Sequence, residues 1–179
     1  MGVRLQAEDF DPGAEAARLA QGRDDVGAVV TFTGLCRRNS DGRPIRAMVL
    51  EHYPAMAQAE LARIEAEARR RWPLDDVLVL HRYGRLEPGD RIVLVVTLSA
   101  HREAAFAAAA FLMDYLKTCA PFWKREEFED GTHWVEARAE DDAAAARWRI
   151  RADPGQARGE RQDDEDRRER ADEEATAGP

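Results

Sequence analysis

Five consecutive aliphatic residues, Ile92 to Val96, constrain the fold of this chain more than any other feature of its sequence. Successive residues of a strand point to opposite faces of a sheet, so a strand of this composition is apolar on both faces. Such a strand lies in the middle of a sheet that helices cover on each side. The run Val77–Tyr83 predicts a neighbouring strand, joined to it through the turn signal Glu87–Asp90, so the two should form an antiparallel pair.

The rest of the first 150 residues alternates between short β-rich runs and helical stretches, without an internal repeat. Further strands are predicted over residues 3–7, 26–33 and 47–53, and helices over 12–19, 54–72 and 99–119. In the helix over 54–72, one apolar stripe should face the sheet, formed by Ala57, Leu61, Ile64 and Ala68. This pattern predicts an α/β (α+β) fold with a mainly antiparallel sheet covered by helices.

Composition changes sharply after Ile150. The 29 residues from Arg151 to Pro179 hold 6 arginines and 10 acidic residues, and they contain no Val, Ile, Leu, Met, Phe, Tyr or Trp. A segment of this kind cannot bury a core. The sequence therefore predicts one compact globular domain over residues 1–150 and a charged, disordered tail over 151–179.

The overall charge and the apolar pattern exclude several classes of protein. With 27 Lys and Arg against 35 Asp and Glu, the net charge of -8 argues against nucleic-acid binding, which depends on clustered cations. No segment approaches the roughly 20 apolar residues that a membrane-spanning helix needs, and no signal pattern begins the chain. We therefore expect a cytoplasmic protein with two reduced cysteines and no membrane partner.

The helix predicted over residues 99–119 carries candidate anion-binding groups in its first turn. Ser99 is the expected N-cap, and His101 and Arg102 follow it. Free backbone N–H groups, the positive end of the helix dipole and two potentially cationic side chains together suit a phosphate.

A lysine extends the apolar face predicted for the same helix. Phe106, Ala110 and Met113 form its predicted inward stripe, and Lys117 follows one turn later. This spacing predicts that Lys117 emerges at the edge of the buried surface.

A second lysine follows shortly after the predicted end of the helix. Beyond Pro121 the chain resumes as an extended segment in which Phe122, Lys124 and Glu126 share one face. Lys124 can therefore turn back toward Lys117. Two neighbouring ammonium groups disfavour each other's charge, and the neutral amine that results is suited to proton transfer in catalysis.

Several motifs occur in a fixed order along residues 3–148. They are Gly27–Gly34 followed by Arg37, then Leu50–Pro54, Ser99–Arg102, Met113–Thr118 leading into Ala120–Glu126, and Trp134–Arg138. Together they resemble the family of the large, catalytic subunit of molybdopterin synthase. Several ordered motifs over most of a chain are much more specific than one short pattern.

The resemblance implies a hammerhead-like fold, a homodimer within a heterotetramer, and a small ubiquitin-like sulfur carrier subunit that ends in Gly-Gly. It also implies the reaction, in which two sulfurs pass from the carrier's C-terminal thiocarboxylate to cyclic pyranopterin monophosphate, giving molybdopterin for molybdenum cofactor biosynthesis. No cofactor and no metal are implied. This chain ends in Gly178-Pro179, so we expect the carrier to be a separate polypeptide.

The same resemblance implies roles for individual residues. Lys117 and Lys124 match the two catalytic lysines, with Lys117 as the main acid–base or electrostatic group and Lys124 tuning it. The implied substrate-binding residues are these two lysines with Leu35, Cys36, Arg37, His101, Arg102, Arg125, Glu126 and Arg138. Neither cysteine is expected to donate sulfur.

The predicted phosphate-binding pair lies far from the lysines of its own chain. Arg102 and Lys117 are fifteen residues apart on one helix, which is about 22 Å and more than a small pterin spans. We therefore expect the partner subunit to supply His101 and Arg102, so that the site straddles the dimer interface.

Two other functions are compatible with a cationic pocket. One is a noncatalytic docking module for a ubiquitin-like partner, in which the lysines serve as docking charges. The other is a pterin or nucleotide-phosphate hydrolase. Against it, the histidines lack the short spacings of a metal site, since they lie at His52, His81, His101 and His133. Substitution of Lys117 separates docking from catalysis, because only docking predicts a loss of carrier affinity.

Overall fold

The computed structural model describes residues 2–118, 121–135 and 146–148. The chain divides into two units, Met1–Ala145 and Ala146–Pro179, and every element named below belongs to the first. The predicted boundary after residue 150 and the predicted tail over 151–179 lie outside the described residues.

The described part of the first unit consists of strands with three helices placed between them. Its elements are β1 (Gly2–Gln6), α1 (Pro12–Ala20), β2 (Ala28–Leu35), β3 (Asn39–Ser40), β4 (Arg43–Pro44), β5 (Ala47–His52), α2 (Pro54–Arg71), β6 (Asp76–Arg82), β7 (Gly84–Leu86), β8 (Arg91–Ser99), α3 (Arg102–Thr118), β9 (Phe122–Phe128) and β10 (Gly131–Val135). The predicted fold class, mixed α/β with mainly antiparallel sheets covered by helices, is confirmed. Within the described ranges, no helix combines the length and the apolar character needed to cross a bilayer.

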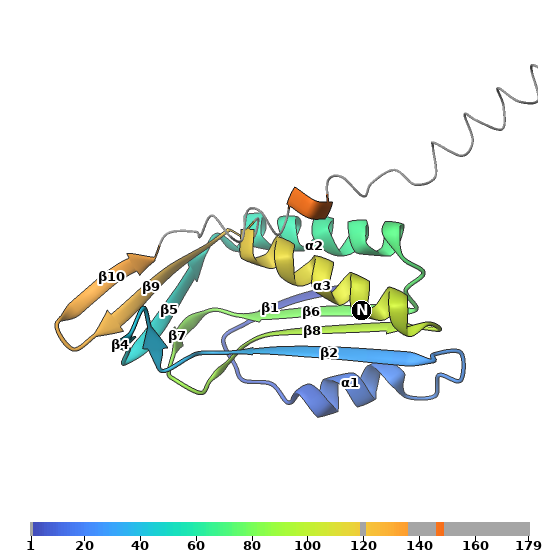
Figure 1. Cartoon of the computed structure of the whole chain (residues 1–179), viewed down its shortest axis with the longest axis horizontal. Helices are drawn as coiled ribbons and strands as arrows, with labels where there is room; N and C mark the ends of the chain where they lie inside the picture. Colours follow the sequence, from blue (N-terminus) through green and yellow to red (C-terminus); the bar gives the residue numbers. More distant parts are fainter. Residues whose placement is uncertain (1, 119–120, 136–145, 149–179) are drawn as a thin grey trace, which may run out of the picture. The chain divides into compact units, whose positions relative to one another are not determined.

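The strand with the long aliphatic run lies inside the first sheet, as predicted. The strand order is β1-β6-β8-β2, with β8 antiparallel to both of its neighbours and β1 parallel to β6. Every residue of β8 from Val93 to Ser99 is buried. Helices α2 and α3 cover one face of this sheet and α1 covers the other (Figure 1).

The two faces of the first sheet have separate apolar contacts. On the α1 side, Leu80 and Leu94 pack with Phe10 and Leu19. On the other side, α2 buries the predicted stripe of Ala57, Leu61, Ile64 and Ala68. The side chains of β6 alternate between these two layers, because neighbouring residues of a strand face opposite ways.

A second sheet lies beyond one end of the first (Figure 1). Its strand order is β10-β9-β5-β7, and all of its pairs are antiparallel. Its inner face shares a cluster with the end of β2, formed by Cys36, Ile45, Met48, Leu50 and Leu86. The short strands β7 and β10 were not predicted from the sequence.

The predicted inward face of α3 is wrong. Phe106, which the sequence analysis placed in the inward stripe, is 63% exposed, and Ala110 is exposed as well. The buried residues of the helix are Ala104, Ala105, Ala108, Ala109, Phe111, Leu112 and Leu116. Alanines occur on every side of this helix and give little contrast between its faces, so the large Phe106 determined the predicted stripe.

The predicted start of α3 is also shifted. The helix begins at Arg102, and Ser99 is the last residue of β8. The Ser99 hydroxyl accepts a hydrogen bond from the His101 N–H at 3.2 Å and donates one to the Pro73 carbonyl at 2.8 Å. Ser99 therefore ties the strand end to the first turn without being the N-cap itself.

Candidate functional site

A cavity of about 800 Å³ lies where the inner face of the second sheet meets the end of α3 and the end of β2. We call it the lysine cavity. Its polar and aromatic wall includes Arg37, His81, Lys117, Phe122, Lys124 and Glu126. Apolar side chains of β2, β5, β8 and α3 complete the lining.

Both candidate catalytic lysines line this one cavity. Lys117 enters from the last turn of α3, and Lys124 enters from β9. They are also the only two lysines of the chain, which otherwise uses arginine for its basic residues. Lysine differs from arginine because its ammonium can lose a proton within a protein, whereas a guanidinium stays charged. Both lysine amines of the chain thus belong to the wall of one cavity.

Lys124 is paired with a buried carboxylate. Alternation along β9 puts Phe122, Lys124 and Glu126 on the inner face of the second sheet, as predicted. The Lys124 Nζ atom lies 2.6 Å from Glu126 Oε1, and the Glu126 side chain is only 5% exposed. The sequence predicts that the two lysines lie close together, but it does not predict the ion pair between Lys124 and Glu126.

The electrostatics of the cavity keep Glu126 ionised. Burial alone would raise the pKa of Glu126, but hydrogen bonds from Lys124 and from the Ser40 hydroxyl outweigh it. The nearby Arg37 charge acts in the same direction, and the pKa lies below its ordinary value. Glu126 therefore presents a fixed negative charge that holds the Lys124 ammonium.

A tight hairpin brings Ser40 to this carboxylate. The turn between β3 and β4 has positive φ at both Asp41 (48°) and Gly42 (81°), the geometry of a two-residue type I′ hairpin. Through this turn the Ser40 hydroxyl reaches Glu126 and donates a hydrogen bond to its carboxylate. Ser40 is buried and lines the lysine cavity.

The end of β2 forms another part of the wall. The pairing of β2 with β8 shifts register between Gly34 and Leu35. A Cβ atom on Gly34 would lie 2.6 Å from Val93 Cγ1, so any larger residue here would have to displace the Val93 side chain of the neighbouring strand. Leu35 lines the cavity and is 54% exposed.

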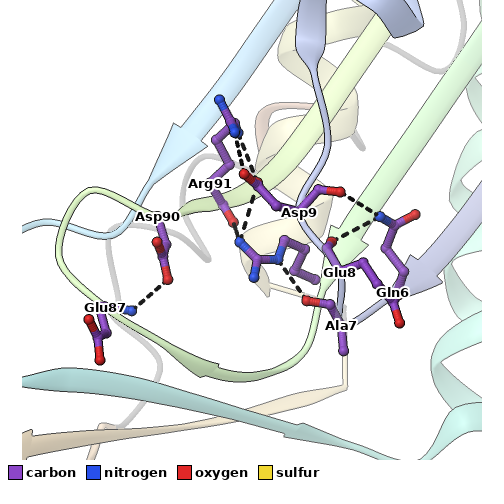
Figure 2. Close-up of polar contacts among 8 residues, drawn as sticks. Gln6, Ala7, Glu8, Asp9, Glu87, Asp90 and Arg91 are labelled. Atoms are coloured by element: carbon purple, nitrogen blue, oxygen red, sulfur yellow. Dashed lines mark hydrogen bonds and ion pairs between the residues drawn. The ribbon is translucent and has the colours of Figure 1, made fainter.

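A polar turn fixes the segment that leads to Arg37. The Cys36 N–H donates to the Asp90 carbonyl, and the Gly89 N–H donates to the Cys36 carbonyl, both at 2.8 Å. The Asp90 carboxylate in turn accepts a hydrogen bond from the Glu87 N–H at 2.8 Å (Figure 2). Arg37 thus follows a residue, Cys36, whose backbone N–H and carbonyl are both hydrogen-bonded to the turn.

An ion pair anchors the same turn to the segment after β1. Arg91, opposite Leu35 in the sheet register, donates from Nε to Asp9 Oδ1 at 2.9 Å (Figure 2). The Arg91 guanidinium lowers the pKa of Asp9 from 3.8 to about 2. Asp9 is consequently ionised at neutral pH, and the pair stays formed.

Cys36 belongs to the implied substrate-binding set, and its side chain does not line the cavity. It is 2% exposed, and its thiol lies 4.0 Å from the Leu86 carbonyl oxygen. Burial raises the pKa of this thiol, which makes it a poor nucleophile. Cys36 contributes packing and backbone contacts.

Three implied site residues lie away from the lysine cavity within this chain. His101 and Arg102 are exposed at the start of α3, at the opposite end of the helix from Lys117. Arg125 faces the other side of β9, 3.7 Å from Glu51 and 5.8 Å from the centre of the Trp134 ring. Arg138 lies outside the described residues.

His81 is a cavity residue that the sequence analysis did not select. On the face of β6 that is turned away from α1, the inward side chains are Val77, Val79 and finally His81. His81 also lines the lysine cavity. One feature of the sequence could have identified His81: it is the one polar residue at the end of a strand face that is otherwise apolar. Burial lowers the pKa of His81 to about 4, so its ring is neutral at pH 7.

The cavity can therefore hold an anionic ring compound. Arg37 and the two lysines supply positive charge, while Phe122, His81 and the aliphatic wall supply flat and apolar surface. Among the residues that the structure describes, no group of three or more His, Cys, Asp and Glu could hold a metal ion.

Comparison with known proteins gives consistent matches. Residues 5–119 match the model of the MoaE protein family. The chain is 58% identical over 149 residues to the molybdopterin synthase catalytic subunit of Mesorhizobium japonicum, covering 82% of this chain and 92% of that protein.

Solved structures agree with this likeness. The molybdopterin biosynthesis MoaE protein of Burkholderia ambifaria is 51% identical, with a TM-score of 0.71 over 82% of this chain and 97% of that one. A chain in the complex of subunits 1 and 2 of the molybdopterin-converting factor of Helicobacter pylori has a TM-score of 0.62. That chain is 18% identical, with 76% of this chain and 90% of that chain covered, so it supports the fold alone.

Proposed function

Because the chain belongs to the MoaE protein family, the catalytic subunits of molybdopterin synthase, we propose that it inserts two sulfurs into cyclic pyranopterin monophosphate. The sulfur comes from the C-terminal thiocarboxylate of a small ubiquitin-like carrier. The observation that carries this proposal is the convergence of the only two lysines of the chain on one cavity.

The charged groups of the cavity have separate roles in this proposal. Lys117 lies beside the attacked pterin carbon and the thiocarboxylate, where it moves a proton or stabilises developing negative charge. Lys124, held by Glu126 at 2.6 Å, keeps the site positive. Arg37 binds the substrate through its guanidinium.

The phosphate is held by the partner subunit of a homodimer. His101 and Arg102 are exposed at the N-terminal end of α3, where backbone N–H groups favour an anion. Support for a dimer comes from exposed apolar side chains on α3 and on β2, which is an edge strand of the first sheet. These side chains are Phe106 (63% exposed), Val29 (42%) and Phe32 (41%).

The carrier delivers its C-terminus to the lysine cavity. Glycine has no side chain, so an extended Gly-Gly tail needs less space to reach the cavity than other residues would. The related Helicobacter pylori structure is itself a complex of two different subunits. Two carriers on a central dimer would give a heterotetramer.

Reconstitution tests the reaction directly. The purified chain, a thiocarboxylated carrier and cyclic pyranopterin monophosphate should yield the dithiolene product. Lys117→Ala should reduce turnover about 100-fold or more while carrier affinity is unchanged. Lost carrier affinity with unimpaired turnover of the bound complex would instead support a docking module.

A matched pair of variants separates the two roles of Lys117. Lys117→Arg keeps the positive charge but cannot release a proton at neutral pH. If Lys117 transfers a proton, the arginine variant should be as inactive as Lys117→Ala. If Lys117 acts only through its charge, the arginine variant should retain most of the activity.

Mixed dimers test the shared site. A Lys117→Ala subunit and an Arg102→Ala subunit, each inactive alone, should regain activity when combined, because one of the two sites in a mixed dimer is intact. Mixed dimers that form and remain inactive would contradict the proposal that the partner supplies Arg102.

A further inference from the structure

One buried polar side chain of the lysine cavity has no role in the proposed sulfur transfer. His81 is 9% exposed, and its ring stacks on Phe122 with 4.1 Å between the ring centres and 17° between the planes. Phe122 and Lys124 are successive inward residues of β9, about 7 Å apart along a strand. His81, which stacks on Phe122, therefore shares the wall of one cavity with Lys124.

The hydrogen bonds of His81 define which ring nitrogen is available. Nδ1 lies 2.8 Å from the carbonyl oxygen of Arg82. A carbonyl can only accept, so Nδ1 carries the proton, and Nε2 of the neutral ring is an acceptor. No hydrogen bond to Nε2 occurs among the described residues.

The other neighbours of His81 leave this protonation state in place. Among the described residues, His52 is the titratable group of another element that acts on the His81 ring, and it opposes a positive charge there. Burial has the same effect. Besides the cationic groups and the Glu126 carboxylate, which Lys124 and Ser40 already contact, the cavity thus presents a neutral acceptor, which a simple anion site does not need.

We propose that His81 orients the pterin, its Nε2 accepting a hydrogen bond from an N–H group of the substrate ring. This inference rests on the proposed function, because it takes the cyclic pyranopterin as the occupant. A reduced pterin carries N–H donors on its edge, and the cationic groups of the cavity cannot accept from them. An acceptor fixed by its own Nδ1 contact gives the ring one preferred orientation relative to the lysines.

The test uses three variants of the full chain in the reconstituted reaction. His81→Phe keeps the aromatic stack on Phe122 and removes the acceptor. His81→Gln restores an acceptor near the position of Nε2 through its amide oxygen. His52→Phe is the matched control, because His52 is part of the same aromatic cluster but lines a separate cavity of about 500 Å³.

The expected result is a change in substrate affinity rather than in chemistry. His81→Phe should raise KM for the pterin about tenfold with kcat within about twofold, since a donor of the bound ring loses its partner. His81→Gln should recover most of the affinity, and His52→Phe should behave as wild type. Equilibrium binding of the pterin without the carrier should show the same order.

Two outcomes would overturn the inference, and both are distinct from failure of the proposed function. An unchanged KM in His81→Phe, with an active wild type, excludes the hydrogen bond. Equal losses in His81→Phe and His81→Gln that follow their melting temperatures indicate a structural role only. A wild-type chain that binds the pterin and makes no dithiolene would refute the proposed function instead.

Discussion

Replacing Glu126 with glutamine tests whether a buried charge organises the lysine cavity. The variant keeps the volume and an acceptor oxygen but removes the negative charge 2.6 Å from Lys124. A hydrogen bond to a charged partner contributes about 1.5–3 kcal/mol and a neutral one about 0.5–1.5 kcal/mol. The exposure of Lys124, at 33%, favours the low end of the difference. We expect the free energy of unfolding to fall by about 1 kcal/mol at pH 7.

The effect has a defined dependence on pH. The pKa of Glu126 is lowered in the folded protein from its ordinary value of 4.5. A lowered carboxylate pKa contributes stability that is present above the unfolded value and is lost as the pH falls through the folded value. The stability difference between wild type and Glu126→Gln should therefore be constant above about pH 6 and shrink steadily below pH 4.5.

Urea unfolding at a series of pH values measures this difference, provided that the m-value is unchanged. Glu127→Gln is the control, because Glu127 faces the other side of β9 and pairs with a half-exposed Arg85. That substitution should change stability by less than about 0.5 kcal/mol. Equal stability of Glu126→Gln and wild type at pH 7, or a difference that does not shrink in acid, would refute the electrostatic account.

Three further predictions concern packing, assembly and the sulfur source. Gly27→Ala should destabilise the fold by about 1–3 kcal/mol, because its Cβ would lie 2.3 Å from the Ala100 carbonyl oxygen; an unchanged melting temperature would contradict this. Phe106→Arg should leave the melting temperature of the monomer unchanged, because this side chain is exposed within its own chain. The same variant should abolish the proposed dimer, as measured by light scattering. Cys36→Ala should keep sulfur transfer within about threefold of wild type when the carrier is supplied as thiocarboxylate, because a buried thiol is unreactive. Loss of product from a folded Cys36→Ala protein would implicate the thiol.

Strong local patterns accounted for most of the fold. The aliphatic run of β8 and the four-residue stripe of α2 each indicate burial by themselves, and both were predicted correctly. The three-residue strand β7 has no such pattern. It exists because β5 lies beside it, and pairing between distant segments is invisible in a local window.

The candidate site was predictable only where its residues belong to segments with a strong local pattern. Lys124 and Glu126 belong to a segment with clear strand alternation, which places their side chains on one face of β9. Lys117 lines the same cavity, although the α3 stripe from which its position was inferred is exposed at Phe106 and Ala110. Ser40 and His81 reach the cavity through a hairpin and through the end of a separate sheet. Their contribution depends on how the two sheets meet, which the sequence pattern does not specify.

The incorrect face of α3 and the proposed shared site have a common explanation. The stripe that begins at Phe106 is apolar, yet Phe106 and Ala110 are exposed within one chain. Within one chain, however, alanines allow the opposite face of α3 to pack closely on β8, where the Thr97 hydroxyl donates to the Ala105 carbonyl at 2.8 Å. In the proposed dimer the remaining apolar stripe is covered by the second subunit. A helix that is apolar on two faces is expected when one face forms the core of its own chain and the other forms an interface.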